Sequence, residues 1–273
     1  MLSRSVCTLV VVVVPAALSA QRAPTQSELD SVSARGRALA GYQRAALRAS
    51  TQLVAKNPDP SRDQRYVAYR ADSGWVVAFG RLNAGRDTFF VSNIGIPAPV
   101  NGTRVDSLFE FVTFNEPGPD VDYLVRAARA MDNAVMALGA TERSYSAAAL
   151  PSPDGDWFVY LTPAADIANV WPLGDDVRYR VSADGERILE KRRMHSGMVE
   201  EAPSARGDGA RLAVGRYRTA LRDEPEDSDV FHVLARRPQT PQLVVTKHFQ
   251  YVIGVDGSIR LVTGRETVVG ATR

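Results

Sequence analysis

Three histidines are the side chains of this sequence best suited to bind a metal ion. His195, His232 and His248 are the only histidines, and all lie in the last third of the chain. Neutral imidazoles bind zinc, and three of them with an open fourth position can form a catalytic zinc site. Because their spacing matches no familiar ligand motif, we expect ordinary hydrogen-bonded histidines. A zinc-dependent hydrolase that uses these three residues is the alternative.

A basic cluster is the second candidate site. Residues 177–181 alternate apolar with polar side chains, Asp184-Gly185 provides a turn, and residues 188–193 lead back along the expected hairpin. Cationic side chains gathered across two strands could bind a phosphate or a carboxylate. The same charges could instead form the solvent face of an edge hairpin and oppose aggregation, which we favour. The candidate anion-binding residues are Arg178, Arg180, Lys191, Arg192 and Arg193.

An acidic run, DEPEDSD at residues 223–229, is rich in the carboxylates that Ca²⁺ prefers. It lacks the alternating acidic order, the glycine and the distal glutamate of a calcium-binding loop. We therefore expect it to form a solvated turn.

Familiar catalytic motifs are missing from the sequence. We find no Gly-x-Ser-x-Gly, Ser-x-x-Lys, His-Glu-x-x-His, P-loop or Gly-x-Gly-x-x-Gly pattern. The catalytic residues therefore stay unassigned, and no cofactor is indicated apart from zinc in the hydrolase alternative.

The first twenty residues have the features of a secretory signal peptide. Arg4 precedes an apolar run from Val6 to Leu18, and the small residues Ser19 and Ala20 follow it. The run is shorter than the roughly 18 residues needed to span a bilayer. Cleavage would remove Cys7, the single cysteine, so we expect a secreted or periplasmic protein without disulfides or a membrane span.

Composition gives little indication of a partner. The chain has 33 Lys and Arg residues against 31 Asp and Glu residues, a formal net charge of +2. Such a balanced charge does not indicate nucleic acid as a partner. A protein or a small molecule remains open as the partner.

Two helices are expected to position these residues. Thr25 and Glu28 form a capping-box pattern, and apolar residues then recur at helical spacing up to Asn57-Pro58. A second helix follows Asp120, where apolar residues repeat every three or four positions, and Gly139 is placed to end it.

Strands are expected to make up most of the remaining chain. A meander is predicted at residues 66–71, 75–82 and 88–94, a loop at 96–103, and a returning strand at 108–114. Further strands are predicted at 144–150 and 157–161, followed by an irregular loop at 162–176 and a mobile segment at 194–209. Residues 229–263 are predicted to form three or four strands, in which Phe249, Tyr251 and Ile253 share an apolar face.

The predicted fold class is α+β, with two helices packed on one side of a largely antiparallel sheet and a C-terminal β-meander. Residues 21–273 form the globular region after the signal peptide at 1–20, either as one domain or as lobes 21–115 and 116–273. A helix followed by a hairpin with a tryptophan occurs twice. Asp72 precedes Trp75 by three residues, and Asp154 precedes Trp157 by the same spacing. This suggests an internal duplication.

For function, the sequence favours an exported, non-catalytic binding or accessory module. The motivation is the signal peptide together with the missing catalytic motifs. The metal-dependent hydrolase remains the alternative, and whether the protein is an enzyme is left open.

Overall fold

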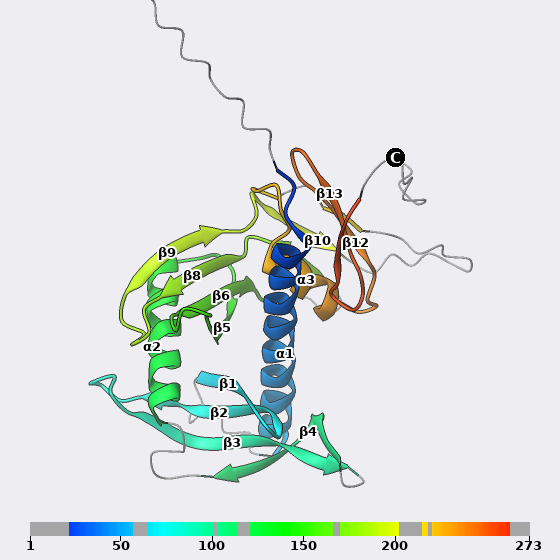
Figure 1. The fold of residues 1–273 in the computed structure, drawn as a ribbon. Helices are drawn as coiled ribbons and strands as arrows, with labels where there is room; N and C mark the ends of the chain where they lie inside the picture. Colours follow the sequence, from blue (N-terminus) through cyan, green and yellow to red (C-terminus); the bar gives the residue numbers. More distant parts are fainter. Residues whose placement is uncertain are drawn as a thin grey trace, which may run out of the picture.

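A long helix lies at the centre of the molecule. The computed structural model describes residues 22–56, 65–100, 103–113, 121–165, 170–201, 215–217 and 220–262. Helix α1 (Gln26–Lys56) runs between a four-stranded sheet near its C-terminal end and a group of short elements near its N-terminal end (Figure 1). Its start is the expected capping box, since Thr25 N donates to Glu28 Oε2 at 2.6 Å and Glu28 N donates to Thr25 Oγ1 at 3.3 Å.

The first sheet is an antiparallel meander in the order β1-β2-β3-β4. Its first three strands and the returning fourth strand were predicted, but the loop predicted at 96–103 is wrong over residues 96–100 and 103, and residues 101–102 lie outside the described residues. Strand β3 continues through Pro97 and Pro99, and the register shifts at Pro97/Ala98. Proline donates no ladder hydrogen bond, and the irregularity accommodates this loss. The strands are β1 (Arg65–Ala71), β2 (Gly74–Leu82), β3 (Phe89–Val100) and β4 (Thr103–Thr113).

A second unit repeats this order of one helix and four meandering strands. Helix α2 (Val121–Leu138) confirms the second predicted helix. The sheet that follows is antiparallel, in the order β5-β6-β8-β9, and includes the basic hairpin expected at 177–193. Its strands are β5 (Tyr145–Pro151), β6 (Trp157–Pro163), β8 (Val177–Val181) and β9 (Ile188–Arg193).

The two segments predicted to be irregular contain a small antiparallel ladder. Strand β7 (Trp171–Gly174) pairs with β10 (Met198–Glu201), so both predictions are wrong over these residues. His195, at the start of the segment predicted to be mobile, has a side chain that is 0% exposed. Residues 166–169 and 202–209 of these segments lie outside the described residues.

The C-terminal region contains a third helix where a strand was expected. Helix α3 (Asp227–Ala235) precedes the meander β12 (Gln242–Val245), β13 (Gln250–Ile253) and β14 (Ile259–Leu261). Strand β11 (Gly215–Tyr217) pairs with β12 in parallel. The predicted meander is therefore confirmed over its last three strands, whereas the two-helix count is wrong.

Local chemistry explains why α3 is a helix. Glu226 N donates to Asp229 Oδ2 at 2.7 Å, and the Glu226 side chain accepts from the backbone of Asp229, which forms a capping box. Val230, Val233 and Leu234 then fall on one buried face at helical spacing. The end of the acidic run, from Glu226 to Asp229, is thus the buried start of a helix, and the prediction of a solvated turn is wrong over these residues.

Helix α3 crosses α1 in close contact at Gly36. A Cβ atom at this position would lie 2.5 Å from Val230 Cβ and 2.6 Å from the carbonyl oxygen of Asp227. Such distances are not tolerated by packed atoms. Gly36 is therefore required for α1 and α3 to approach one another.

The two large sheets are buried on both faces, with one long helix on each side. Along β1 and β2, Val67 and Val76 belong to the hydrophobic cluster around α2, whereas Ala68 and Val77 belong to the cluster around α1. Strands β5 and β6 alternate in the same way. The prediction of both helices on one side is wrong, and residues from both proposed lobes share each of these two clusters.

Tyr42 of α1 joins the facing edges of the two sheets. Its side chain is fully buried, its hydroxyl lies 3.7 Å from Met131 Sδ, and the backbone of Ala68 in β1 and of Ala149 in β5 lies close enough to act on its pKa. Burial raises the pKa of this hydroxyl, so it stays protonated. One side chain thus lies between two strand edges that are not paired with each other.

The packing of the last meander gives a test of its face assignment. Ile253→Ala should lower the free energy of unfolding by about 2–5 kcal/mol, because Ile253 is fully buried in the cluster that joins α1, α3 and the third sheet. His248→Ala should cost less than half as much, because the His248 side chain is 36% exposed. Urea denaturation measures both changes. Equal shifts of the two midpoints at unchanged m-values would contradict the assignment.

Candidate functional site

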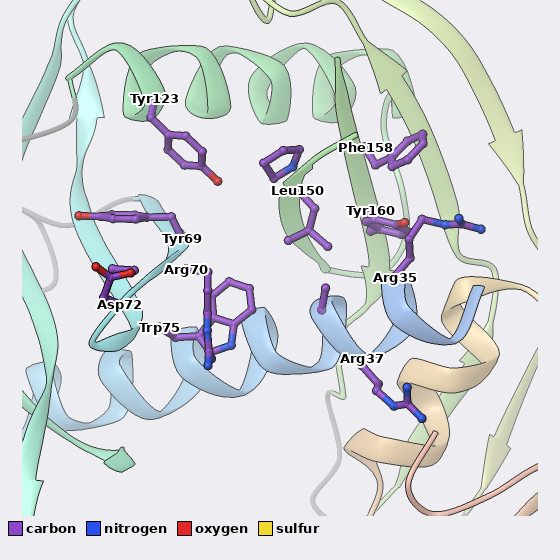
Figure 2. Close-up of a pocket in the computed structure, with 13 residues that line it drawn as sticks. Arg35, Arg37, Tyr69, Arg70, Asp72, Trp75, Tyr123, Leu150, Phe158 and Tyr160 are labelled. Atoms are coloured by element: carbon purple, nitrogen blue, oxygen red, sulfur yellow. The ribbon is translucent and has the colours of Figure 1, made fainter. Parts of the chain in front are cut away.

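A cavity opens where strands β1 and β5 end. It has a volume of about 850 Å³ and lies between α1, α2 and the two hairpins β1-β2 and β5-β6 (Figure 2). Its lining residues are mainly aromatic, aliphatic or basic. They are Arg35, Arg37, Ala38, Tyr69, Arg70, Ala71, Asp72, Trp75, Tyr123, Leu150, Pro151, Phe158 and Tyr160.

Three aromatic rings form one side of the cavity. The rings of Tyr69 in β1 and Tyr123 in α2 are 5.5 Å apart and tilted by 53°. The indole of Trp75 lies against α1 at Gly41, where an added Cβ would stand 2.6 Å from the indole nitrogen. The guanidinium of Arg70 lies over this indole at 5.9 Å. This wall is therefore fixed by ring packing and by a glycine on the neighbouring helix.

The opposite side is formed by strands β5 and β6 together with the start of α1. Leu150, Phe158 and Tyr160 provide an apolar surface, and Arg35 lies beside Tyr160 (Figure 2). The Tyr160 hydroxyl donates to Asp227 Oδ2 at 2.8 Å. Burial raises the pKa of Tyr160, and the adjacent carboxylate raises it further, so the hydroxyl remains a donor.

Asp227, at the start of α3, is the junction between the cavity and the interior. Arg35 Nε donates to Asp227 Oδ1 at 2.9 Å, and Arg178 Nη1 donates to Asp227 Oδ2 at 2.6 Å. Burial alone would lower the pKa of Arg178, but the attraction of Asp227 raises it. One carboxylate therefore joins α1, β6, β8 and α3.

A buried histidine network lies behind this junction. His195 places Nδ1 at 3.2 Å from Asp176 Oδ2 and Nε2 at 3.0 Å from Asp229 Oδ1. His232 Nε2 lies 2.9 Å from the same Asp176 oxygen. All four side chains are at most 5% exposed. The network is thus enclosed by protein and does not open onto a surface.

Members of this network are charged although they are buried, because neighbouring groups of opposite charge stabilise the charged forms. Burial opposes the charge of His195, but Asp229 and Asp176 raise its pKa to about 10. Burial would also raise the pKa of Asp176, but the two imidazoles lower it to about 2. At neutral pH the network therefore contains an imidazolium held by two carboxylates, which is an arrangement that fixes the structure.

The structure brings together two of the three histidines predicted as metal ligands. His195 and His232 meet at Asp176, whereas His248 pairs with Asp223 at 2.7 Å near the surface. Within the described ranges, no group of three or more His, Cys, Asp or Glu side chains has the geometry to hold a metal ion. The zinc content of purified protein remains the direct test of the zinc hypothesis.

The five basic candidates each have a partner in the structure. Arg178 and Arg192 are cross-strand neighbours, as expected, but Arg178 is buried on Asp227 and Arg192 bonds Glu226 at 2.6 Å. The others contact Asp154 and Asp156 (Arg180), Asp175 (Arg193), and the Ala137 carbonyl and Tyr179 ring (Lys191). Each of these basic side chains therefore contacts other groups of the folded chain.

The cavity was not predicted from the sequence. Its walls come from two helices and four strands, and residues as far apart as Arg35 and Tyr160 meet there. The sequence feature that could have indicated the cavity is the pair of predicted hairpins with a tryptophan after the turn, because the cavity lies between those hairpins. No helix in the described residues is long and apolar enough to cross a membrane.

The chemistry of the lining favours binding over catalysis. Among the described residues that line the cavity, Asp72 is the one carboxylate, and none is His, Ser, Thr or Cys. Burial raises the pKa of Tyr123, as does neighbouring Tyr69, which makes Tyr123 a poor general base. The site offers ring faces, arginines and hydroxyls, which suit recognition.

Comparison with known proteins supplies no functional information. The chain matches no protein-family model, no curated protein and no solved structure. Function must therefore be inferred from the residues of the site.

Proposed function

We propose that this protein is an exported, non-catalytic binding module that holds a small molecule between the β1-β2 and β5-β6 hairpins. The observation that carries the proposal is the cavity of about 850 Å³, walled by aromatic rings on two sides. Cavities of roughly 300–1,000 Å³ with mostly apolar walls and a few polar groups are typical of small-molecule sites. Export remains a proposal from the sequence, and an intact mass that begins near Gln21 in extracellular or periplasmic protein would support it.

The proposed ligand has a flat or bulky apolar body. Trp75, Tyr69 and Tyr123 present ring surfaces on one side, and Leu150 and Phe158 face them from the other (Figure 2). Burying an apolar body against such walls contributes roughly 25 cal/mol for each Å² removed from water. The contacts that fix Trp75 and Tyr160 keep the walls in place before the ligand arrives, which limits the entropy lost on binding.

We also infer that the two helix-and-meander units arose by duplication. Both units have the same strand order, and each tryptophan contacts a tyrosine on its own helix, Trp75 with Tyr42 and Trp157 with Tyr123. The cavity would then lie at the junction of the two copies. An experimental structure in which residues 26–113 superpose on 121–193 with Trp75 on Trp157 would support this, and a superposition that separates the two tryptophans would oppose it.

A neutral fluorescent reporter such as phenylnaphthylamine tests whether the cavity binds ligands. The reporter should bind saturably and brighten as it leaves water. Ala38→Trp, which places an indole in the cavity, should weaken binding by at least about tenfold. Ala34→Trp is the matched control, since Ala34 lies on the same helix but is exposed and does not line the cavity.

Urea denaturation of both variants should show that they remain folded. Reporter binding that Ala38→Trp leaves unchanged would refute the proposed function, as would a wild type that binds neither this reporter nor other small aromatic probes.

A further inference from the structure

The cavity has an excess of positive charge. Three of its lining residues are the arginines Arg35, Arg37 and Arg70, and one, Asp72, is acidic. Asp72 lies at the tip of the β1-β2 hairpin, whereas Arg35 lies at the opposite end of the cavity (Figure 2). The charge at the end formed by Arg35, Tyr160 and Phe158 is therefore not balanced by the acidic residue of the lining.

At the Arg35 end of the cavity two guanidinium groups share one carboxylate. Asp227 carries one negative charge and accepts from two guanidinium groups, those of Arg35 and Arg178. Arg35 makes its contact through Nε, so its terminal nitrogens are left as donors, and its side chain is 31% exposed. The Tyr160 hydroxyl directs its proton to Asp227 as well. An arriving anion would thus meet the exposed part of a guanidinium that shares its one carboxylate partner with Arg178.

Arg37 points away from the other lining residues and toward the turn between β13 and β14 (Figure 2). Its Nε donates to the backbone carbonyl oxygen of Asp256 at 2.8 Å, a neutral acceptor that holds the side chain in place. The carboxylate of Asp256 accepts from Ser258 and shares the field of Arg37. Arg35 is therefore better placed than Arg37 to form a direct contact.

Ligands of other charge fit this site less well. A cation would find ring faces in Tyr69, Trp75 and Tyr123 but would be repelled by three arginines. A neutral molecule that filled the cavity would remove water from the arginine heads without replacing its hydrogen bonds. An acidic group avoids both costs.

We propose that the ligand of this site is a small acid, with an aromatic or aliphatic body between the ring walls and an anionic group, such as a carboxylate, on Arg35. The inference rests on the proposed function and extends it by naming the charge of the ligand and the residue that recognises this charge. A guanidinium offers a carboxylate two parallel donors, which gives direction as well as attraction.

Naphthylacetate and naphthylacetamide are the probes, because they share one body and differ in charge. The acid should bind wild-type protein at least about tenfold more tightly than the amide, because only the acid gains a charged hydrogen bond. Raising the salt concentration from about 50 to 500 mM should weaken the acid several-fold and leave the amide within about twofold. Titration calorimetry measures all four affinities.

Substitutions test whether Arg35 is the residue that gives the acid its tighter binding. Arg35→Gln should weaken the acid by about tenfold and leave the amide within about twofold, while Arg44→Gln, which removes an exposed charge from the same helix, should change neither. Should Arg35→Gln fail to fold, the wild-type salt dependence carries the test. If the amide matches the acid in wild type, the acid hypothesis fails while the proposed function stands. If neither probe nor the neutral reporter binds, the proposed function fails and this inference fails with it.

Discussion

Replacing Asp227 by asparagine is expected to lower the free energy of unfolding by about 3–5 kcal/mol. Asp227 is 1% exposed and carries the one carboxylate that faces both Arg35 and Arg178. Asparagine keeps the shape but removes the charge, which leaves the buried Arg178 and the partly buried Arg35 without this counter-ion. Breaking a buried ion pair from one side costs far more than the pair contributes. Urea denaturation of wild type and variant gives the difference directly.

The matched control for this change is Asp154→Asn. Asp154 also pairs with an arginine, Arg180, at 3.0 Å, but its side chain is 68% exposed. Solvent screens such a pair, so the control should differ little from wild type. Equal effects of the two substitutions would show that the junction at Asp227 is not the buried element inferred here.

Stability should fall by about 3 kcal/mol as the pH rises from 7 to 9.5. Asp229 and Asp176 raise the pKa of His195 from 6.5 to about 10 in the folded protein. The folded chain therefore keeps a proton over this range that the unfolded chain has already lost. Stability from such a group is complete below pH 6.5 and is lost as the pH rises through about 10. The slope cannot exceed about 1.4 kcal/mol for each pH unit from one proton.

The pH range from 7 to 9.5 is chosen because other titratable groups change the stability mainly outside it. Burial raises the pKa of Glu226 to about 7, against the opposing effect of Arg192, so Glu226 contributes a loss of the same sign mainly below pH 7. The tyrosines contribute mainly above pH 10. His195→Gln should flatten the slope between pH 7 and 9.5, whereas His248→Gln should preserve it. A wild-type stability that is constant or rises over this range would contradict a charged His195.

Much of the fold could be predicted because its elements have strong local patterns. The apolar repeat from Leu124 to Leu138 marked α2, and the alternation through Tyr251 and Ile253 marked β13. Helix α3 was missed because it is short. Nine residues give little periodicity, and the acidic start resembles a solvated turn until Arg35 and His195, distant in the sequence, provide its counter-charges.

The candidate site could not be predicted because no local pattern contains it. Tyr69 and Tyr123 meet only because α2 packs across the first sheet, and Arg35 reaches Asp227 across 192 residues of chain. The histidines illustrate the same limit. Their residue type indicated a metal site, whereas the fold pairs two of them with Asp176 and leaves His248 near the surface.

The indole N–H signals of the three tryptophans test most directly whether the cavity beside Trp75 binds a ligand. Trp75 lines the cavity, Trp157 donates to the Ala183 carbonyl at 3.1 Å, and Trp171 lies in β7. In ¹H–¹⁵N spectra titrated with naphthylacetate, the Trp75 signal should shift to saturation with the calorimetric affinity, while the other two move far less. A titration that leaves Trp75 unmoved, or that shifts all three signals equally, would contradict a ligand site at this position.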